Sequence, residues 1–193
     1  MERELRQLRS AASNFTVRDD GENNLYIEGY FAVFNSNYNL WEGASESVAP
    51  GAFKNTLDGD IRALIDHETR LVLGRTTAGT LELREDDKGL WGRIKINPND
   101  SDAMNLYERV KRGDVNQCSF GFDIISEETD FNGDNIHWTI KEVRLYEVSV
   151  CTFPAYQETS VDARKNDYNT IVQRKNEAWK SEMLKKLKGE TSC

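Results

Sequence analysis

The sequence predicts a mainly β fold of the α+β class, in which a closed or nearly closed antiparallel barrel carries a few peripheral helices. Two observations lead to this prediction. Many short strand-like segments, bounded by Gly, Asn and Asp turn residues, run along the chain, and few segments have helical character. In addition, 193 residues suffice for one core domain with a tail.

The charge distribution divides the chain into parts. We expect a leader at residues 1–14, a core domain at 15–160 and a charged, helical or flexible tail at 161–193. The tail has eight Lys or Arg and five Asp or Glu, a net charge of +3; because the whole chain carries -8, residues 1–160 carry -11. The acidic charge of the core argues against nonspecific nucleic-acid binding, which relies on a basic surface, and we expect no specific nucleic-acid partner.

The strand predictions rest on apolar alternation and β-branched or aromatic residues between turn signals. The predicted strands are residues 15–17, 25–34, 61–65, 71–74, 80–83, 90–96, 117–124, 136–140 and 143–150.

The remaining segments are predicted as helices or loops. Residues 1–12 read as a short polar helix or an unstructured leader, and residues 35–49 as a polar loop. Pro50 favours the start of a short helix at 51–57. Residues 101–111 have a helical apolar pattern between a possible cap at Asp100 or Ser101 and Gly113. Residues 168–187 form a partly amphipathic segment.

The most informative predicted strand carries one hydroxyl among apolar neighbours. Because successive strand side chains point to opposite faces, Cys118 and Phe120 lie on the apolar face and Ser119 on the other. Gly121 leaves space above the backbone on the face of Ser119. The pattern suits a nucleophile but is weak evidence by itself, since most strand serines are simply solvated.

Two other residues complete a possible catalytic set. His67 follows the predicted strand at 61–65, and Glu147 interrupts the apolar strand at 143–150. Burying a carboxylate is costly unless it is paired, and an imidazole is a suitable partner. Ser119, His67 and Glu147 therefore predict a nucleophile, a general base and the group that orients the base.

Short motifs recur in order through most of residues 15–160. They are Glu-Gly-Tyr-Phe-Ala-Val-Phe-Asn at 28–35, Pro-Gly-Ala-Phe at 50–53, Leu-Ile-Asp-His at 64–67, Leu-Gly-Arg-Thr at 73–76, Asp-Lys-Gly-Leu at 87–90, Cys-Ser-Phe-Gly-Phe at 118–122, Leu-Tyr-Glu-Val-Ser-Val at 145–150 and Pro-Ala-Tyr at 154–156. In this ordered combination the chain resembles the prohead (capsid maturation) proteases of tailed bacteriophages, a family related in fold to herpesvirus assemblin.

The resemblance implies roles for individual residues. It makes Ser119 the nucleophile, His67 the base and Glu147 the orienting acid. Because the third member in the herpesvirus relatives is a second histidine, His137 stays a competitor for that last role. By analogy with the assemblin fold, residues 152–155 are candidates for the oxyanion-binding amides.

The resemblance also implies a function. We expect a serine endopeptidase inside the assembling procapsid, in the bacterial host cytoplasm. Its partners would be the major capsid protein with its scaffold segment, or a scaffolding protein, and self-association and autocleavage are possible. The alternative is a catalytically inactive module that keeps the fold and binds capsid subunits.

Other chemistries find little support in the sequence. Cys118 is predicted to face the core, where free cysteine is commonly found. The two histidines and three cysteines lack zinc-ligand spacing, so we expect neither a metal nor an organic cofactor. No apolar run is long enough to span a membrane, and the N-terminus lacks signal-peptide character.

Overall fold

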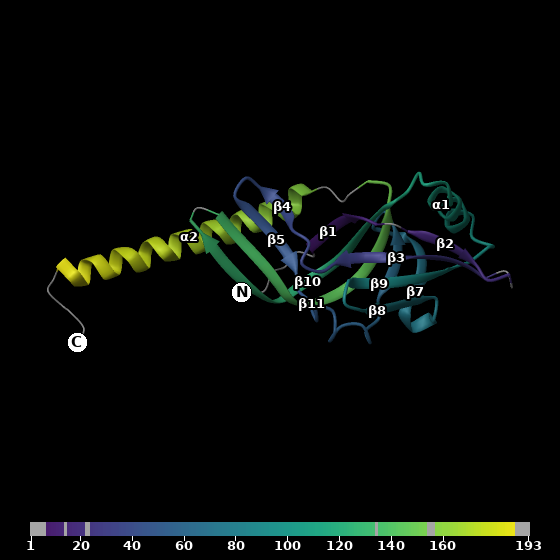
Figure 1. Cartoon of the computed structure of the whole chain (residues 1–193), viewed down its shortest axis with the longest axis horizontal. Helices are drawn as coiled ribbons and strands as arrows, with labels where there is room; N and C mark the ends of the chain where they lie inside the picture. Colours follow the sequence, from purple (N-terminus) through teal and green to yellow (C-terminus); the bar gives the residue numbers. More distant parts are fainter. Residues whose placement is uncertain (1–6, 14, 22–23, 134, 154–156, 188–193) are drawn as a thin grey trace. The chain divides into compact units, whose positions relative to one another are not determined.

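The computed structural model describes residues 7–13, 15–21, 24–133, 135–153 and 157–187 (Figure 1). The chain forms two compact units, Met1–Gln157 and Glu158–Cys193. The first contains two β-sheets and helix α1 (Ser101–Arg112), and the second contains most of helix α2 (Gln157–Leu187).

The larger sheet is built around a long hairpin, which Figure 1 shows as two curved strands, β10 and β11. Its principal strand order is β1 (Gln7–Ala12), β10 (Gln117–Asn132), β11 (Asn135–Cys151), β5 (Ala44–Val48) and β4 (Tyr38–Trp41). Strand β11 is so long that one strand can pair with each half. It pairs in parallel with β5 at residues 136–140 and with β6 (Arg62–Ile65) at residues 147–150, and β6 pairs in turn with β7 (Glu68–Arg75).

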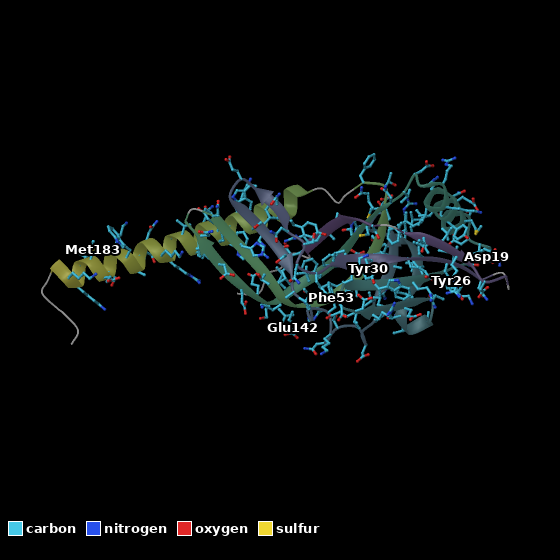
Figure 2. The ribbon with its side chains drawn as sticks, viewed as in Figure 1. Asp19, Tyr26, Tyr30, Phe53, Glu142 and Met183 are labelled. Carbon is cyan, nitrogen blue, oxygen red and sulfur yellow. The ribbon has the colours of Figure 1, made fainter. Side chains whose placement is uncertain are left out.

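The smaller sheet has the order β2 (Thr16–Asp19), β3 (Leu25–Val33), β9 (Gly89–Ile96) and β8 (Leu81–Glu85). A short 3₁₀ helix, η1 (Thr76–Ala78), precedes β8. Tyr26 and Tyr30, labelled in Figure 2, project from β3, and the Tyr30 hydroxyl donates a hydrogen bond to Asp86 at the β8–β9 turn.

The mainly β prediction is confirmed, but the closed barrel is not. Within the described residues neither sheet closes on itself. The pairing is also not purely antiparallel, because β5 and β6 both run parallel to β11.

One hydrophobic core joins both sheets and α1. It includes Phe31 of β3, Ile94 of β9, Leu106 of α1 and Phe120 of β10, each at most 2% exposed. The ring of Phe120 lies 5.6 Å from that of Phe53 and 4.8 Å from that of Phe122. This packing fixes the apolar face of β10 and so directs Ser119 to the opposite face.

Helix α1 confirms the predicted boundaries. Asp100 accepts hydrogen bonds from the backbone N–H groups of Asp102 and Ala103, and Gly113 ends the helix with a φ of 87°. Both are expected capping arrangements. The helix leads through the buried Val115 into β10, the strand that carries Ser119.

The predicted strands 136–140 and 143–150 form one continuous strand, β11. Three segments that were expected to be helix, leader or loop also differ in the structure. Residues 7–12, expected as a helix or leader, form β1, which pairs with β10. Residues 35–49, expected as a loop, contain β4 and β5. Residues 51–57, expected as a helix, form successive turns, because their i to i+3 hydrogen bonds do not continue into a helix. The Glu85 carboxylate, which accepts the N–H groups of Gly51 and Phe53, holds this turn region.

Candidate active site

His67 is presented by a tight turn. Ile65 and Glu68 pair across the β6–β7 hairpin, so that Asp66 and His67 alone form its loop. Both loop residues have positive φ, 48° for Asp66 and 62° for His67. Two consecutive positive φ values are the signature of a type I′ turn, in which Asn, Asp and Gly are favoured. Histidine is unusual here, and its side chain is 20% exposed.

The imidazole of His67 is hydrogen-bonded to a buried carboxylate. Its Nδ1 atom lies 2.8 Å from Oε1 of Glu147, whose side chain is only 3% exposed. Ser149 donates a hydrogen bond of 2.6 Å to the other carboxylate oxygen, and its Oγ lies 3.3 Å from Nδ1 of His67. Glu147 therefore has a partner at each oxygen, as a buried carboxylate requires.

Ser119 lies on the neighbouring strand, facing this network. It is the register partner of Ser149 on β11, while Ser10 faces it from β1. Directly opposed residues of an antiparallel pair have Cβ atoms about 4.5–5.5 Å apart and share a face of the sheet. Ser119 thus lies opposite Ser149, the residue whose Oγ contacts the imidazole. Its side chain is fully buried, and its Oγ has no hydrogen-bond partner among the described residues.

The second ring nitrogen of His67 faces a thiol. Nε2 lies 3.9 Å from Sγ of Cys151, at the end of β11. Cys151 is 1% exposed, and burial raises the pKa of its thiol well above the ordinary value. The thiol is therefore protonated at neutral pH, which makes it a weak donor rather than a nucleophile.

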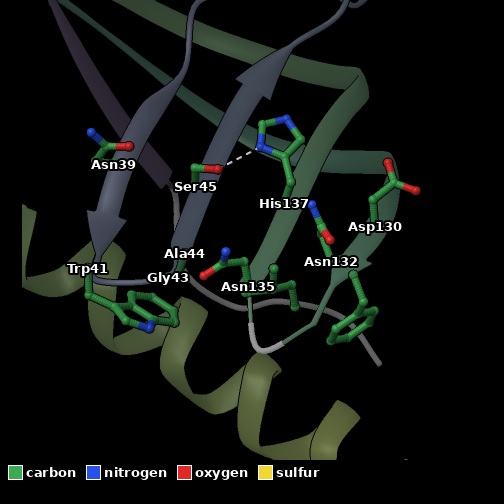
Figure 3. Close-up of a pocket in the computed structure, with 11 residues that line it drawn as sticks. Asn39, Trp41, Gly43, Ala44, Ser45, Asp130, Asn132, Asn135 and His137 are labelled. Atoms are coloured by element: carbon green, nitrogen blue, oxygen red, sulfur yellow. Dashed lines mark hydrogen bonds between the residues drawn. The ribbon is translucent and has the colours of Figure 1, made fainter.

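His137 lies far from this site. It precedes Glu147 by ten positions on β11, about 33 Å at 3.3 Å per residue. Both ring nitrogens contact hydroxyls, Nδ1 with Ser45 and Nε2 with Ser47, each at 2.8 Å. Figure 3 shows His137 beside Ser45. Both line a cavity of about 370 Å³ whose lining mixes polar residues such as Asn135 with apolar ones such as Trp41. The geometry does not bring His137 to His67.

The candidate amides for oxyanion binding are only partly described. The N–H of Thr152 donates to Oδ1 of Asp66 at 2.7 Å, so it is already engaged. Phe153 is exposed, and residues 154–155 lie outside the described part of the chain.

Within the described residues no group of three or more His, Cys, Asp or Glu side chains is placed to hold a metal ion. Among the described helices, none is long and apolar enough to cross a membrane.

Comparison with known families then places the chain. The model of the caudovirus prohead serine proteases matches residues 13–174, most of the sequence and the whole of the site just described. The chain belongs to the caudovirus prohead serine protease family.

Individual relatives agree with this membership. The chain is 33% identical over 152 residues to the prohead protease of Enterobacteria phage HK97, a match that covers 76% of this chain and 63% of that protein. The chain thus spans less than two thirds of the relative's length. The fold resembles the capsid assembly protease of bacteriophage T4, with a TM-score of 0.52, 12% identity, and coverage of 76% of this chain and 96% of that one.

In this family member, sequence reasoning missed three residues of the site. Ser149 and Cys151 contact the His67 ring, and Asp66 bonds the turn that carries His67 to Thr152. The signal for Ser149 is strand alternation, which places it two positions after Glu147 and so on the same face of the strand. The positions of Asp66 and Cys151 depend on β6 pairing with β11, which the sequence pattern does not reveal.

Proposed function

We propose that this protein is a serine endopeptidase of phage procapsid maturation. The observation that carries the proposal is the His67–Glu147 hydrogen bond, formed on the same face of the sheet as Ser119 in a member of a prohead serine protease family. A base with an orienting carboxylate next to a serine is the arrangement that serine hydrolysis requires.

In the proposed mechanism, His67 acts through Nε2. The Glu147 carboxylate accepts a hydrogen bond from Nδ1–H of His67, which leaves Nε2 with the lone pair that removes the proton from Ser119. The Ser119 oxygen attacks the peptide carbonyl, and His67 returns the proton to the leaving amine. Glu147 stabilises the imidazolium that forms between the two steps. Water then releases the acyl group by the same base catalysis.

We propose substrates by analogy with the relatives. Proteins named as prohead and capsid assembly proteases point to the scaffold segment of the major capsid protein, or a separate scaffolding protein, as the substrate. Cleavage would occur inside the procapsid in the host cytoplasm. The protease itself would be a further substrate, cut in its exposed terminal segments.

Ser119 must become accessible before it can react. Its side chain is fully buried in this structure, so a peptide cannot reach the hydroxyl without a local rearrangement. The nucleophile also has to come within hydrogen-bond distance of Nε2, which Cys151 now faces. We propose that assembly into the procapsid promotes this change.

The test is the intact mass of the major capsid protein of the same phage, co-expressed with each variant. Wild type should produce discrete fragments, and Ser119→Ala should produce none. Ser47→Ala is the matched control, because Ser47 is also a buried strand serine that contacts a histidine, but at His137. Cleavage by Ser119→Ala as fast as by wild type would refute the assignment of the nucleophile.

A second candidate is an inactive capsid-binding module with the same fold. The observation in its favour is the buried Ser119 hydroxyl, which is not hydrogen-bonded to His67. Capsids that assemble normally with wild type and Ser119→Ala, and that contain only uncut proteins in both cases, would support it. A fluorophosphonate probe that labels wild-type procapsids at Ser119 would exclude it.

A further inference from the structure

The turn that carries His67 has a backbone conformation that its second residue does not favour. Asp66 and His67 both have positive φ, and a type I′ turn prefers glycine at the position of His67. Such a conformation persists only when the surrounding structure fixes it. The contacts that fix this turn therefore determine where the imidazole points.

Those contacts converge on Asp66. Its backbone N–H donates to the carbonyl of Val150 at 3.1 Å. Its carboxylate accepts two further hydrogen bonds from Thr152, one of 2.7 Å from the backbone N–H and one of 3.2 Å from the hydroxyl. These three bonds attach the turn to the end of β11.

The strand to which the turn is attached also carries the partners of His67. Every second position of β11 lies on one face of the strand, and this face carries Glu147, Ser149 and Cys151. Cys151 immediately precedes Thr152. A bond between Asp66 and Thr152 thus sets the position of the turn relative to the carboxylate that orients the imidazole. Asp66 is itself exposed, and among the described residues it forms no hydrogen bond with Ser119 or with the ring of His67.

We infer that Asp66 is a positioning residue, whose hydrogen bonds to Thr152 hold His67 in the orientation that pairs Nδ1 with Glu147. In its catalytic consequence the inference rests on the proposed function. Asp66 itself takes no part in the proposed proton transfers and acts only by holding the turn in place. Displacing a catalytic base by about 1 Å can reduce a rate roughly 100-fold.

The test uses graded variants of the full-length chain. Asp66→Ala removes both side-chain bonds, and Thr152→Val removes only the hydroxyl bond. Asp66→Asn keeps an acceptor for the Thr152 N–H and a residue that tolerates positive φ. Asp86→Ala is the matched control, because Asp86 likewise accepts turn N–H groups, those of Lys88 and Gly89, in a hairpin without a histidine.

The first readout is the Nδ1 proton resonance of His67 by NMR, which reports the bond to Glu147 without reference to proteolysis. The chain has two histidines, so His137→Gln assigns the signal. We expect wild type, Asp66→Asn and Asp86→Ala to show the hydrogen-bonded signal. Asp66→Ala should lose it while near-UV circular dichroism stays native, and Thr152→Val should broaden or shift it.

The second readout is the cleavage rate of the co-expressed capsid protein. Asp66→Ala should be roughly 10- to 100-fold slower and Asp66→Asn should recover most of the rate. If the capsid protein is never cut by wild type, yet Asp66→Ala still loses the His67 signal, the proposed function fails and the positioning role stands. An unchanged His67 resonance in folded Asp66→Ala would overturn the inference, whatever the cleavage rate.

Discussion

The thiol of Cys151 lies 3.9 Å from Nε2 of His67, the nitrogen that must serve Ser119 in the proposed mechanism. Since burial raises the pKa of the thiol, Cys151 is neutral and does not compete as a nucleophile. The arrangement fills the space beside the base with a weakly polar, uncharged group. In the proposed mechanism this leaves Ser119, and not the thiol of Cys151, as the nucleophile that His67 serves.

We predict that Cys151→Ala cuts the capsid protein at a rate close to that of wild type. The thiol supplies neither a nucleophile nor a strong hydrogen bond to His67. The measurement is the time course of capsid-protein cleavage in co-expressing cells, with Ser119→Ala as the inactive reference. Complete loss of cleavage in a folded Cys151→Ala protein would instead make Cys151 part of the chemistry.

We expect a large loss of proteolytic activity when the charge of the Glu147 carboxylate is removed. Glu147→Gln keeps the size of the side chain but no longer stabilises the imidazolium and permits the wrong tautomer of His67. Comparable changes in serine proteases lower kcat by about 10⁴-fold. We expect a loss of about 10³- to 10⁴-fold in capsid-protein cleavage, measured by quantitative mass spectrometry.

Ser149→Ala should lose less activity than Glu147→Gln, because the His67–Glu147 bond of 2.8 Å remains. It removes only the hydrogen bond of 2.6 Å to the second carboxylate oxygen. The same cleavage assay ranks the two variants. A Ser149→Ala protein as inactive as Ser119→Ala would show that Ser149 itself has an essential role.

A buried ion pair holds β1 in the larger sheet. Arg9 forms a bidentate pair with Glu46 of β5, with Nη2 2.8 Å from Oε2, and both residues are at most 4% exposed. Because Arg9→Met leaves the Glu46 charge buried without its main partner, we expect a loss of about 3–5 kcal/mol in the free energy of unfolding. Urea denaturation measures it.

The control for Arg9 is an exposed pair. Arg18 lies 3.9 Å from Glu28 with its side chain 57% exposed, so Arg18→Met should cost about 0–1 kcal/mol. The double variant Arg9→Met with Glu46→Met should be more stable than Arg9→Met alone, because no charge is left buried. Equal stability of the single and double variants would show that the pair contributes through packing only.

Much of the fold follows from local sequence patterns. The alternating apolar residues of β3 and β9 and the caps of α1 at Asp100 and Gly113 predict these elements to within a few residues. β5 was missed because Glu46, a charged residue, occupies a core position. Its ion pair with Arg9, 37 residues away, compensates the buried charge, and the sequence pattern does not show such a distant partner.

The candidate site, like the fold, was predictable from the sequence only in part. The need of a carboxylate in an apolar strand for a partner predicted the His67–Glu147 contact, which the structure contains. The roles of the three predicted residues are still a proposal. The bonds of Asp66 to Thr152 and the contact of Cys151 with His67 arise from the parallel pairing of β6 with β11, which no periodicity in either segment encodes.

We expect the ion pair of Asp60 with Arg75 to make the stability of the protein fall at acidic pH. Its hydrogen bonds with Arg75, of 2.6 and 2.7 Å, lower the pKa of the carboxyl from 3.8 to about 2. A carboxyl whose folded-state pKa is depressed stabilises the native state above its unfolded pKa and loses that contribution as the pH falls through the folded value. The stability difference between wild type and Asp60→Asn should therefore be constant above pH 3.8 and shrink toward pH about 2 in urea unfolding experiments.

Arg75→Gln, which removes the main cause of the shift, should weaken the same acid dependence, and high salt should reduce it because the pair is exposed. A difference that stays constant down to pH about 2 would mean that the ion pair does not persist in solution.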